Sequence, residues 1–175
     1  MTRLLGIDLG TRRIGLAVAE AGPGAAGGAT GTGAAGATIR PLATISRGTA
    51  LRDATTIARI CEEQRIDEIV VGLPLSLRGD EAAMAVSARA WAEAVLGPLG
   101  LPVSWRDERL TTERAASRLP APRRGRSGGA PSAAQRGAHR ASLDREAAAI
   151  ILQAELDARA AAPATARDGG AVPVQ

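Results

Sequence analysis

Short apolar runs near the N-terminus predict a β-hairpin. One run covers residues 3–9 and the next covers Ile14 to Ala19, and the residues from Gly10 to Arg13 between them are typical of a turn. After a stretch of Gly, Ala, Pro and Thr, an apolar run resumes at residues 39–45. These three runs predict a meander of three strands.

The second half of the pattern alternates between helical and strand periods. Apolar positions recur at helical spacing over residues 50–65 and 81–96, while residues 67–73 and 101–107 are short, mostly apolar runs typical of strands. Thr111 or Thr112 can cap a short helix through Leu119, and a last helix is expected from about Leu143 to Ala160. A meander followed by alternating helices and strands favours an α/β fold of the ribonuclease H type, a mixed five-stranded sheet flanked by helices.

The length and the low-complexity segments set the expected domain organisation. A chain of 175 residues fits one domain, which we expect to cover residues 1–160. Flexible loops are expected near 21–38 and 119–142, because Gly, Pro, Ser and Arg dominate there. Residues 161–175 are expected to be a disordered tail.

Composition narrows the function classes. The chain has two Trp and no Phe or Tyr, which argues against an RNA-binding module that stacks bases on aromatic side chains. A single cysteine, Cys61, excludes an internal disulfide and a cysteine zinc site, and its apolar surroundings favour a buried position. The N-terminus shows no signal peptide and no segment is apolar for 18 residues, so a cytoplasmic protein without membrane association is expected.

Three regions carry acidic residues that could support catalysis. Asp8 lies inside an apolar strand, where a carboxylate is costly unless it meets a cation or strong donors; alternatively, it is a turn residue before Gly10. Asp107 and Glu108 end a strand, and alternation lets only one of them face Asp8; a surface pair with a neighbouring Arg is the alternative. Asp144 is expected in the first turn of the last helix, where the helix dipole alone could explain it.

Convergence of these acids would create a metal site. Two carboxylates about 4 Å apart repel by roughly 4 kcal/mol at an effective dielectric constant near 20, and divalent cations relieve that repulsion. Oxygen ligands without His or Cys favour Mg²⁺ or Mn²⁺. Two such ions would bind both the attacking water and the leaving oxygen of a phosphodiester.

Four sequence blocks resemble the signature of the YqgF family, which comprises bacterial Holliday-junction-resolvase-like proteins also described as candidate nucleases maturing the precursor of 16S ribosomal RNA. The resemblance extends over residues 4–156, and the blocks occur in family order. They are LGIDLGTRRIGLA (5–17), VVGLPL (70–75), DERLTT (107–112) and DREAAAIIL (144–152).

The resemblance implies a ribonuclease-H-like fold with an acidic triad of Asp8, Glu108 and Asp144, in which Asp107 is the alternative for the middle place. It also implies a two-metal-ion nuclease that matures the 5′ end of precursor 16S ribosomal RNA, or, as the alternative, resolves Holliday junctions. Gly10 and Gly15 would let the first hairpin pass close to the substrate backbone. A monomer or weak homodimer is expected.

Arginines supply every basic charge of the chain, whose formal net charge is +4. Six Arg and no acid lie between Arg118 and Arg140, which suggests a phosphate clamp in the loop before the last helix, although a merely solvated charge run is the alternative. The candidate nucleic-acid contacts are Arg12, Arg13, Arg78, Arg109, Arg123, Arg124 and Arg126.

Two other functions remain as alternatives. The string from Gly6 to Thr11 also resembles the first phosphate loop of actin-like and sugar-kinase ATPases, but those proteins need a second such domain and 175 residues leave no room for it. A non-catalytic ribosome-assembly or transcription factor that keeps the fold is the stronger rival. All three acids are present, however, and a pure binder of polyanions has no reason to hold carboxylates against its ligand.

Overall fold

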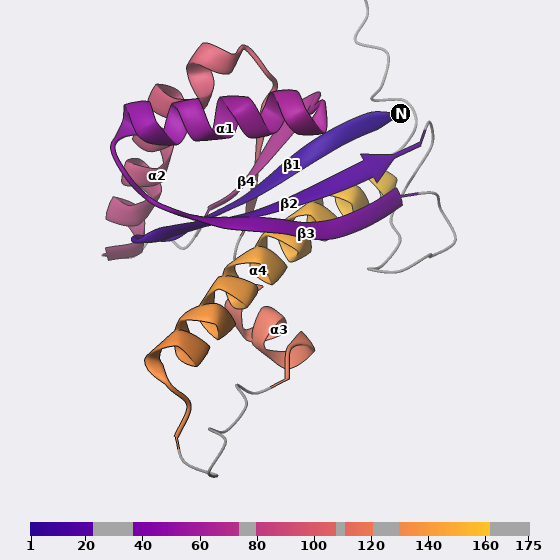
Figure 1. Cartoon of the computed structure of the whole chain (residues 1–175). Coiled ribbons are helices and arrows are strands. Elements are labelled where there is room, and N and C mark those ends of the chain that lie inside the picture. The colour runs from indigo at the N-terminus through magenta and orange to yellow at the C-terminus, as the bar shows by residue number, and fades with distance from the viewer. Residues whose placement is uncertain (23–36, 74–79, 108–110, 121–129, 162–175) are drawn as a thin grey trace, which may run out of the picture.

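Five strands form one mixed sheet in the computed structural model, which describes residues 1–22, 37–73, 80–107, 111–120 and 130–161 (Figure 1). The strand order is β3-β2-β1-β4-β5. The β1–β2 and β2–β3 pairs are antiparallel, and the β1–β4 and β4–β5 pairs are parallel. The strands are β1 (Thr2–Leu9), β2 (Arg13–Ala21), β3 (Ala37–Ser46), β4 (Glu68–Leu73) and β5 (Val103–Asp107).

Helices cover both faces of the sheet. Helices α1 and α2 lie on one face, α4 crosses the other face obliquely, and α3 packs beside α4 (Figure 1). No helix in the described ranges is both long and apolar enough to cross a membrane. The helices are α1 (Ala50–Gln64), α2 (Asp80–Leu96), the short 3-10 helix η1 (Gly97–Leu99), α3 (Thr111–Arg118) and α4 (Ala133–Ala161).

Alternation along β1 divides the interior into two cores. Leu5 and Ile7 pack with residues of α1 and α2, whereas Leu4 packs with apolar residues of α4 and Gly6 lies against Leu152 of that helix. The even positions of β1 therefore face α4. This alternation decides on which side of the sheet the acid at position 8 stands.

The same alternation holds in β5. Val103 and Trp105 pack against the core beneath α1 and α2. Arg106 faces the other way and forms an ion pair with Glu155 of α4. The α4 face of β5 is thus the face of its even-numbered residues.

The start of α4 differs from the expectation. A loop was expected over 119–142 and a helix from about Leu143, but the helix already begins at Ala133. Ser132 and Gln135 form a reciprocal cap, in which Gln135 N donates to Ser132 Oγ at 3.1 Å and Ser132 N donates to Gln135 Oε1 at 2.7 Å. Because this cap satisfies free amides and the following turns are rich in Ala and Arg, the segment folds as helix despite its glycine. Residues 121–129 of the expected loop, residues 23–36 of the other expected loop and residues 162–175 of the expected tail lie outside the described residues.

Candidate active site

Asp8 stands near the end of β1, on the face that α4 covers. It pairs across the antiparallel ladder with Gly15 of β2 and is partly buried. On its other side, the parallel pairing of Ile7 with Val71 brings Gly72 next along β4. Asp8 therefore has glycine neighbours on both adjoining strands.

Asp144 reaches the same place from α4. The helix begins at Ala133, so Asp144 lies well inside it and not in its first turn as expected. The field of a helix dipole falls off within the first turn. A favourable position at a helix start therefore does not explain this acid.

A close contact between backbone atoms brings α4 against the hairpin of β1 and β2. A Cβ built on Gly15 would lie 1.9 Å from the backbone oxygen of Asp144, a distance that no real side chain allows. Gly15 was expected to let substrate backbone approach, but the close neighbour that requires a glycine here is the helix. The backbone contact fixes Asp144 beside the strand residue that pairs with Asp8.

Arg13 connects the two acids. Its Nε lies 2.5 Å from Asp144 Oδ2 and its second terminal nitrogen lies 3.5 Å from Oδ1 of the same carboxylate. The hydrogen bond to Asp144 raises the pKa of Arg13 above its ordinary value, and the negative charges of Asp144 and Asp8 add to the effect against the opposing influence of burial. The guanidinium therefore interacts electrostatically with both carboxylates.

Hydrogen bonds from Arg47 fix the turn that carries Arg12 and Arg13. Arg47 donates its backbone N–H to Arg12 O at 3.0 Å and its guanidinium to Gly10 O at 3.2 Å. The loop of Arg47 is fixed in turn by Asp53, a buried acid of α1 that accepts hydrogen bonds from Gly48 N at 2.8 Å and from the indole of Trp91 at 3.0 Å. A side chain of α1 thus holds the position of the first hairpin turn.

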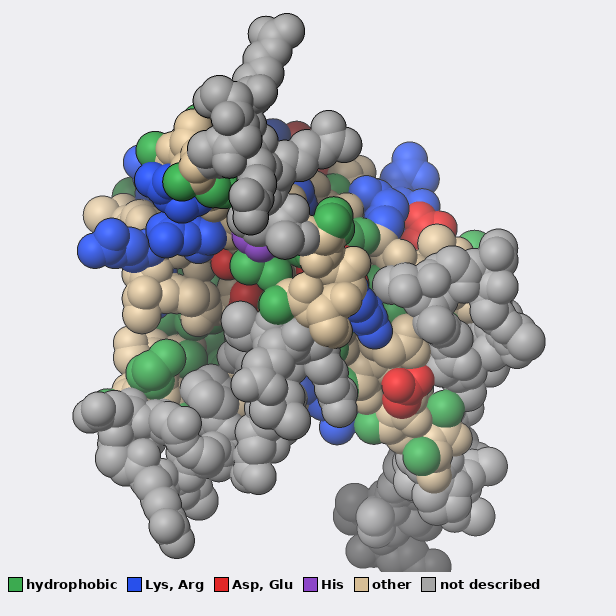
Figure 2. Space-filling view, turned by 90° about the horizontal axis from the view of Figure 1, so that it is seen from below, with side chains coloured by type: hydrophobic (Ala, Val, Ile, Leu, Met, Phe, Trp, Pro, Cys, Tyr) green, Lys and Arg blue, Asp and Glu red, His purple; other side chains and the backbone are tan. Residues whose placement is uncertain are grey.

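A hollow of about 320 Å³ opens beside the acids. The view from the end where α4 begins shows arginine side chains beside a recess that contains acidic side chains (Figure 2). Arginine side chains and a carboxylate that line one hollow suit a phosphodiester held beside a metal site. The hollow is lined by Gly10, Thr11, Arg12, Arg13, Arg140 and Asp144.

The structure brings together four of the residues selected from the sequence: Asp8, Asp144, Arg12 and Arg13. Asp107 is the last residue of β5, and its side chain is not among those described. The remaining candidates lie outside the described residues, and they are Glu108, Arg78, Arg109, Arg123, Arg124 and Arg126.

Arg140 ends the arginine run that the sequence suggested as a phosphate clamp, but it was not among the individual candidate residues. It lines the hollow from α4, one helical turn before Asp144. The spacing of four residues would have placed both side chains on one helix face, if the helix had been expected to start before Leu143. The cap at Ser132 and Gln135 was the missed signal.

The residues around Asp8 suit a hard divalent cation. Asp8 and Asp144 both offer carboxylate oxygens, which is the donor chemistry of Mg²⁺ and Mn²⁺, and the described residues that line the hollow include neither His nor Cys. Among the described residues no group of three possible ligands is found.

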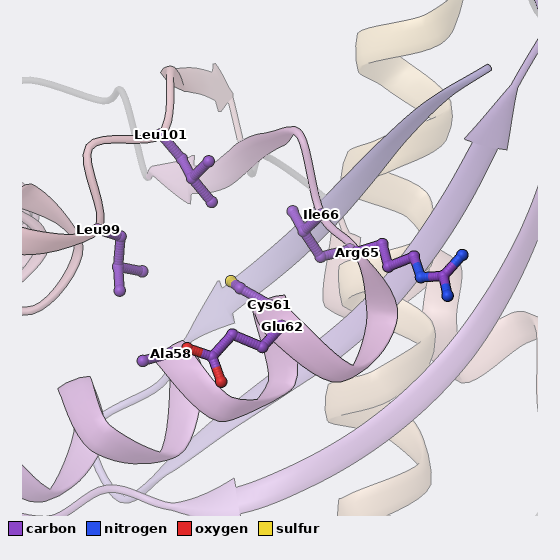
Figure 3. Close-up of a pocket in the computed structure, with 7 residues that line it drawn as sticks. All are labelled: Ala58, Cys61, Glu62, Arg65, Ile66, Leu99 and Leu101. Carbon is purple, nitrogen blue, oxygen red and sulfur yellow. The ribbon is translucent and has the colours of Figure 1, made fainter.

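A second pocket, of about 330 Å³, lies on the other side of the sheet, between the end of α1 and the segment around η1 (Figure 3). Cys61 lies in it, and burial together with the charge of Glu62 raises the pKa of its thiol to about 11. The thiol is therefore protonated near neutral pH and acts as a small apolar side chain, as expected. The lining residues are Ala58, Cys61, Glu62, Arg65, Ile66, Leu99 and Leu101.

Solved structures show the fold. The chain superposes with a TM-score of 0.52 on Thermus thermophilus RuvC in complex with a Holliday junction substrate, over 90% of this chain and 96% of that one, at 18% identity. RuvC has the ribonuclease-H-like fold, so the expected fold class is confirmed.

Curated relatives match at higher identity. A protein of Anaeromyxobacter sp. (strain K) named "Putative pre-16S rRNA nuclease" is 39% identical over 158 residues, which are 90% of this chain and 98% of the relative. A relative of the same name from Thermosynechococcus vestitus is 34% identical, over 91% of this chain and 90% of its own. The family model described as "RuvX: Holliday junction resolvase" matches residues 2–158. The resemblance to the YqgF family is thereby confirmed, and the chain belongs to the RuvX family, another name for the same group.

Proposed function

We propose that this chain is a divalent-metal-dependent nuclease that matures the 5′ end of precursor 16S ribosomal RNA. The observation that carries the proposal is the placement of Asp8 and Asp144 on one face of the sheet, beside a hollow that Asp144 lines together with Arg12, Arg13 and Arg140. The names of the curated relatives support the choice of substrate. We also propose that residues 1–160 act as one domain, as a monomer or weak homodimer.

Glu108 is proposed as the third acid. Arg106 lies on the α4 face of β5, as its ion pair with Glu155 shows, and the residue two positions further has the same parity. That parity favours Glu108 over Asp107 as the partner of Asp8 and Asp144. The three carboxylates would hold Mg²⁺ or Mn²⁺, two ions in all.

The bound metal would supply the activation of water and the neutralisation of charge on the phosphate. The protein residues do the rest. Arg12 and Arg140 hold the phosphodiester at the rim through charge-assisted hydrogen bonds, and the backbone contact at Gly15 keeps Asp144 at a fixed distance from Asp8.

A direct comparison of substrates tests the proposal. Purified protein with Mn²⁺ is incubated with a precursor 16S ribosomal RNA fragment and, separately, with a four-way DNA junction. We expect trimming of the RNA 5′ end, and we expect Asp8→Asn to abolish it while nucleic-acid binding stays intact or tightens, because the change removes negative charge and no phosphate contact.

Other outcomes would identify the alternatives. Cleavage of the junction alone would favour the activity named in the description of the family model. If neither substrate is cut and Glu108→Ala leaves RNA binding unchanged, the chain is a non-catalytic binding factor. Wild-type rates in Asp8→Asn with Mg²⁺ would contradict the metal assignment.

A further inference from the structure

The guanidinium of Arg13 and a metal ion bound by Asp144 and Asp8 would compete for the same two carboxylates. The guanidinium touches the Asp144 carboxylate at 2.5 Å and is attracted by Asp8. We propose that Arg13 is an internal counter-ion, which neutralises the acids in the metal-free protein and moves to the substrate phosphate when a divalent cation binds. This proposal rests on the proposed metal-dependent function.

The backbone keeps the two acids on neighbouring positions. Asp144 is held against Gly15 by the packing of α4, and Gly15 pairs with Asp8, so the backbones of the two acids cannot move apart. Carboxylates fixed near each other repel unless a cation is close. Arg13, two residues before Gly15 and therefore on the same face of β2, provides that cation.

The Arg13 side chain also has a second possible partner, a phosphate in the hollow. Its side chain is 36% exposed, and it borders the hollow that Arg12 and Arg140 line. A guanidinium matches the geometry of phosphate as well as that of carboxylate. Once a divalent cation has replaced it at Asp144, Arg13 can complete a group of three arginines around a phosphodiester.

The exchange couples the two ligands. A metal ion favours the conformation in which Arg13 has left the acids, and a bound phosphate favours the same conformation. Metal and nucleic acid should therefore each raise the affinity of the protein for the other. Without nucleic acid, Arg13 should lower the affinity for metal.

The decisive measurement is Mn²⁺ binding to the free protein, followed by the electron paramagnetic resonance signal of unbound Mn²⁺. Arg13→Gln is compared with Arg12→Gln, which removes the same charge from the neighbouring residue, for which no carboxylate partner is found among the described residues. We expect Arg13→Gln to raise Mn²⁺ affinity about fivefold and Arg12→Gln less than twofold. Equal effects of the two changes, or a loss of affinity in Arg13→Gln, would overturn the proposal.

Thermal unfolding measures the same coupling by a second method, because metal changes the stability gap between two proteins only as far as their metal affinities differ. Arg13→Gln should melt below the wild type in metal-free buffer, and saturating Mn²⁺ should narrow this gap, because the metal then neutralises the acids in both proteins. A gap that persists unchanged would mean that Arg13 is only a structural ion-pair partner.

Asp8→Asn separates this proposal from the proposed function. If Asp8→Asn does not weaken Mn²⁺ binding, no metal binds at these acids and both proposals fall. If it does weaken binding while Arg13→Gln and Arg12→Gln behave alike, the metal site stands and only the counter-ion role is wrong.

Discussion

Gly15 and Gly6 determine how closely α4 approaches the sheet. A Cβ on Gly15 would meet the backbone oxygen of Asp144 at 1.9 Å, and one on Gly6 would meet the backbone oxygen of Ala148 at 2.7 Å. Backbone atoms of a long helix cannot move aside as the end of a flexible side chain can. The smallest side chain is therefore required at both positions for steric reasons, and no left-handed backbone angle is involved.

Gly15→Ala should lower the free energy of unfolding by about 1–3 kcal/mol, because overpacking forces the helix away from the strand. The cleavage rate should fall by more than the loss of folded protein accounts for, because Asp144 moves away from Asp8 together with the helix. Urea unfolding and single-turnover cleavage measure the two effects.

Gly137→Ala is the matched control. Gly137 lies in α4, and a Cβ there would have no atom within 4 Å. The substitution should raise stability by about 0.5–1 kcal/mol through helix propensity alone. Equal behaviour of the two alanine variants would show that α4 does not rest on Gly15.

At the scale of elements, the C-terminal half of α4 is tied to two strands by charge. Glu155 is buried and pairs with Arg106 of β5 and, at 2.6 Å, with Arg159 of its own helix. Arg159 also pairs with Glu68 of β4 at 2.5 Å. Burial raises the pKa of Glu155, but the hydrogen bonds from Arg106 and Arg159 outweigh it, so the pKa lies below its ordinary value of 4.5.

Glu155→Gln should destabilise the fold by about 1–3 kcal/mol at pH 7, because it leaves two arginines without their shared carboxylate. A lowered pKa in the folded state means that this stabilisation is fully present above the unfolded pKa, near 4.5, and is lost as the pH falls through the lower folded value. The difference from wild type in urea unfolding should therefore shrink below about pH 4.5. A difference that is constant down to pH 3 would show that the charge of Glu155 is not the cause.

The first turn of α4 depends on its cap. Ser132→Ala removes one of the two reciprocal hydrogen bonds and should cost about 1 kcal/mol of local stability. Hydrogen exchange of the amides after Ala133 should accelerate, while exchange in the buried stretch from Ala147 to Leu152 stays slow. Uniform acceleration in both segments would mean that the helix unfolds as one unit.

The apolar patterns predicted the five strands and the helices α1 and α2, because each buries an apolar face, and a threonine cap predicted α3; the short helix η1 was not predicted. The patterns also did not predict the first ten residues of α4. That segment is mostly exposed and has no apolar stripe to reveal a helical period, so only its cap identifies it. The candidate site shows the same limit: Asp8 and Asp144 are interruptions in apolar patterns and could be found, whereas the partnership of Arg13 with Asp144 joins residues 131 positions apart.

At the scale of the whole molecule, the arginines of the hollow should control binding by electrostatics. Each phosphate contact contributes about 0.7–0.9 to the slope of log affinity against log salt concentration. Arg140→Gln should lower the slope by about that amount, and replacing Arg123, Arg124 and Arg126 with Gln should lower it by about two to three units. Arg59→Gln is the control, because Arg59 pairs with Glu63 on α1, away from the hollow. An unchanged slope in the triple variant together with a lowered melting temperature would mean that those arginines are structural.

The uninterrupted course of α4 would also let the proposed nuclease set the distance between a point of grip and the cut. Arg136, Arg140 and Asp144 follow one another at intervals of four residues, so their Cα atoms are spaced by roughly 6 Å along one side of a stiff rod. A nucleic-acid strand that is gripped at the exposed beginning of the rod is presented to Asp144 at a set number of steps from the point of grip. Inserting four residues of helix before Arg136 would lengthen the rod without moving Arg140 and Asp144 from the hollow, and a grip at the new first turn would shift the cut accordingly.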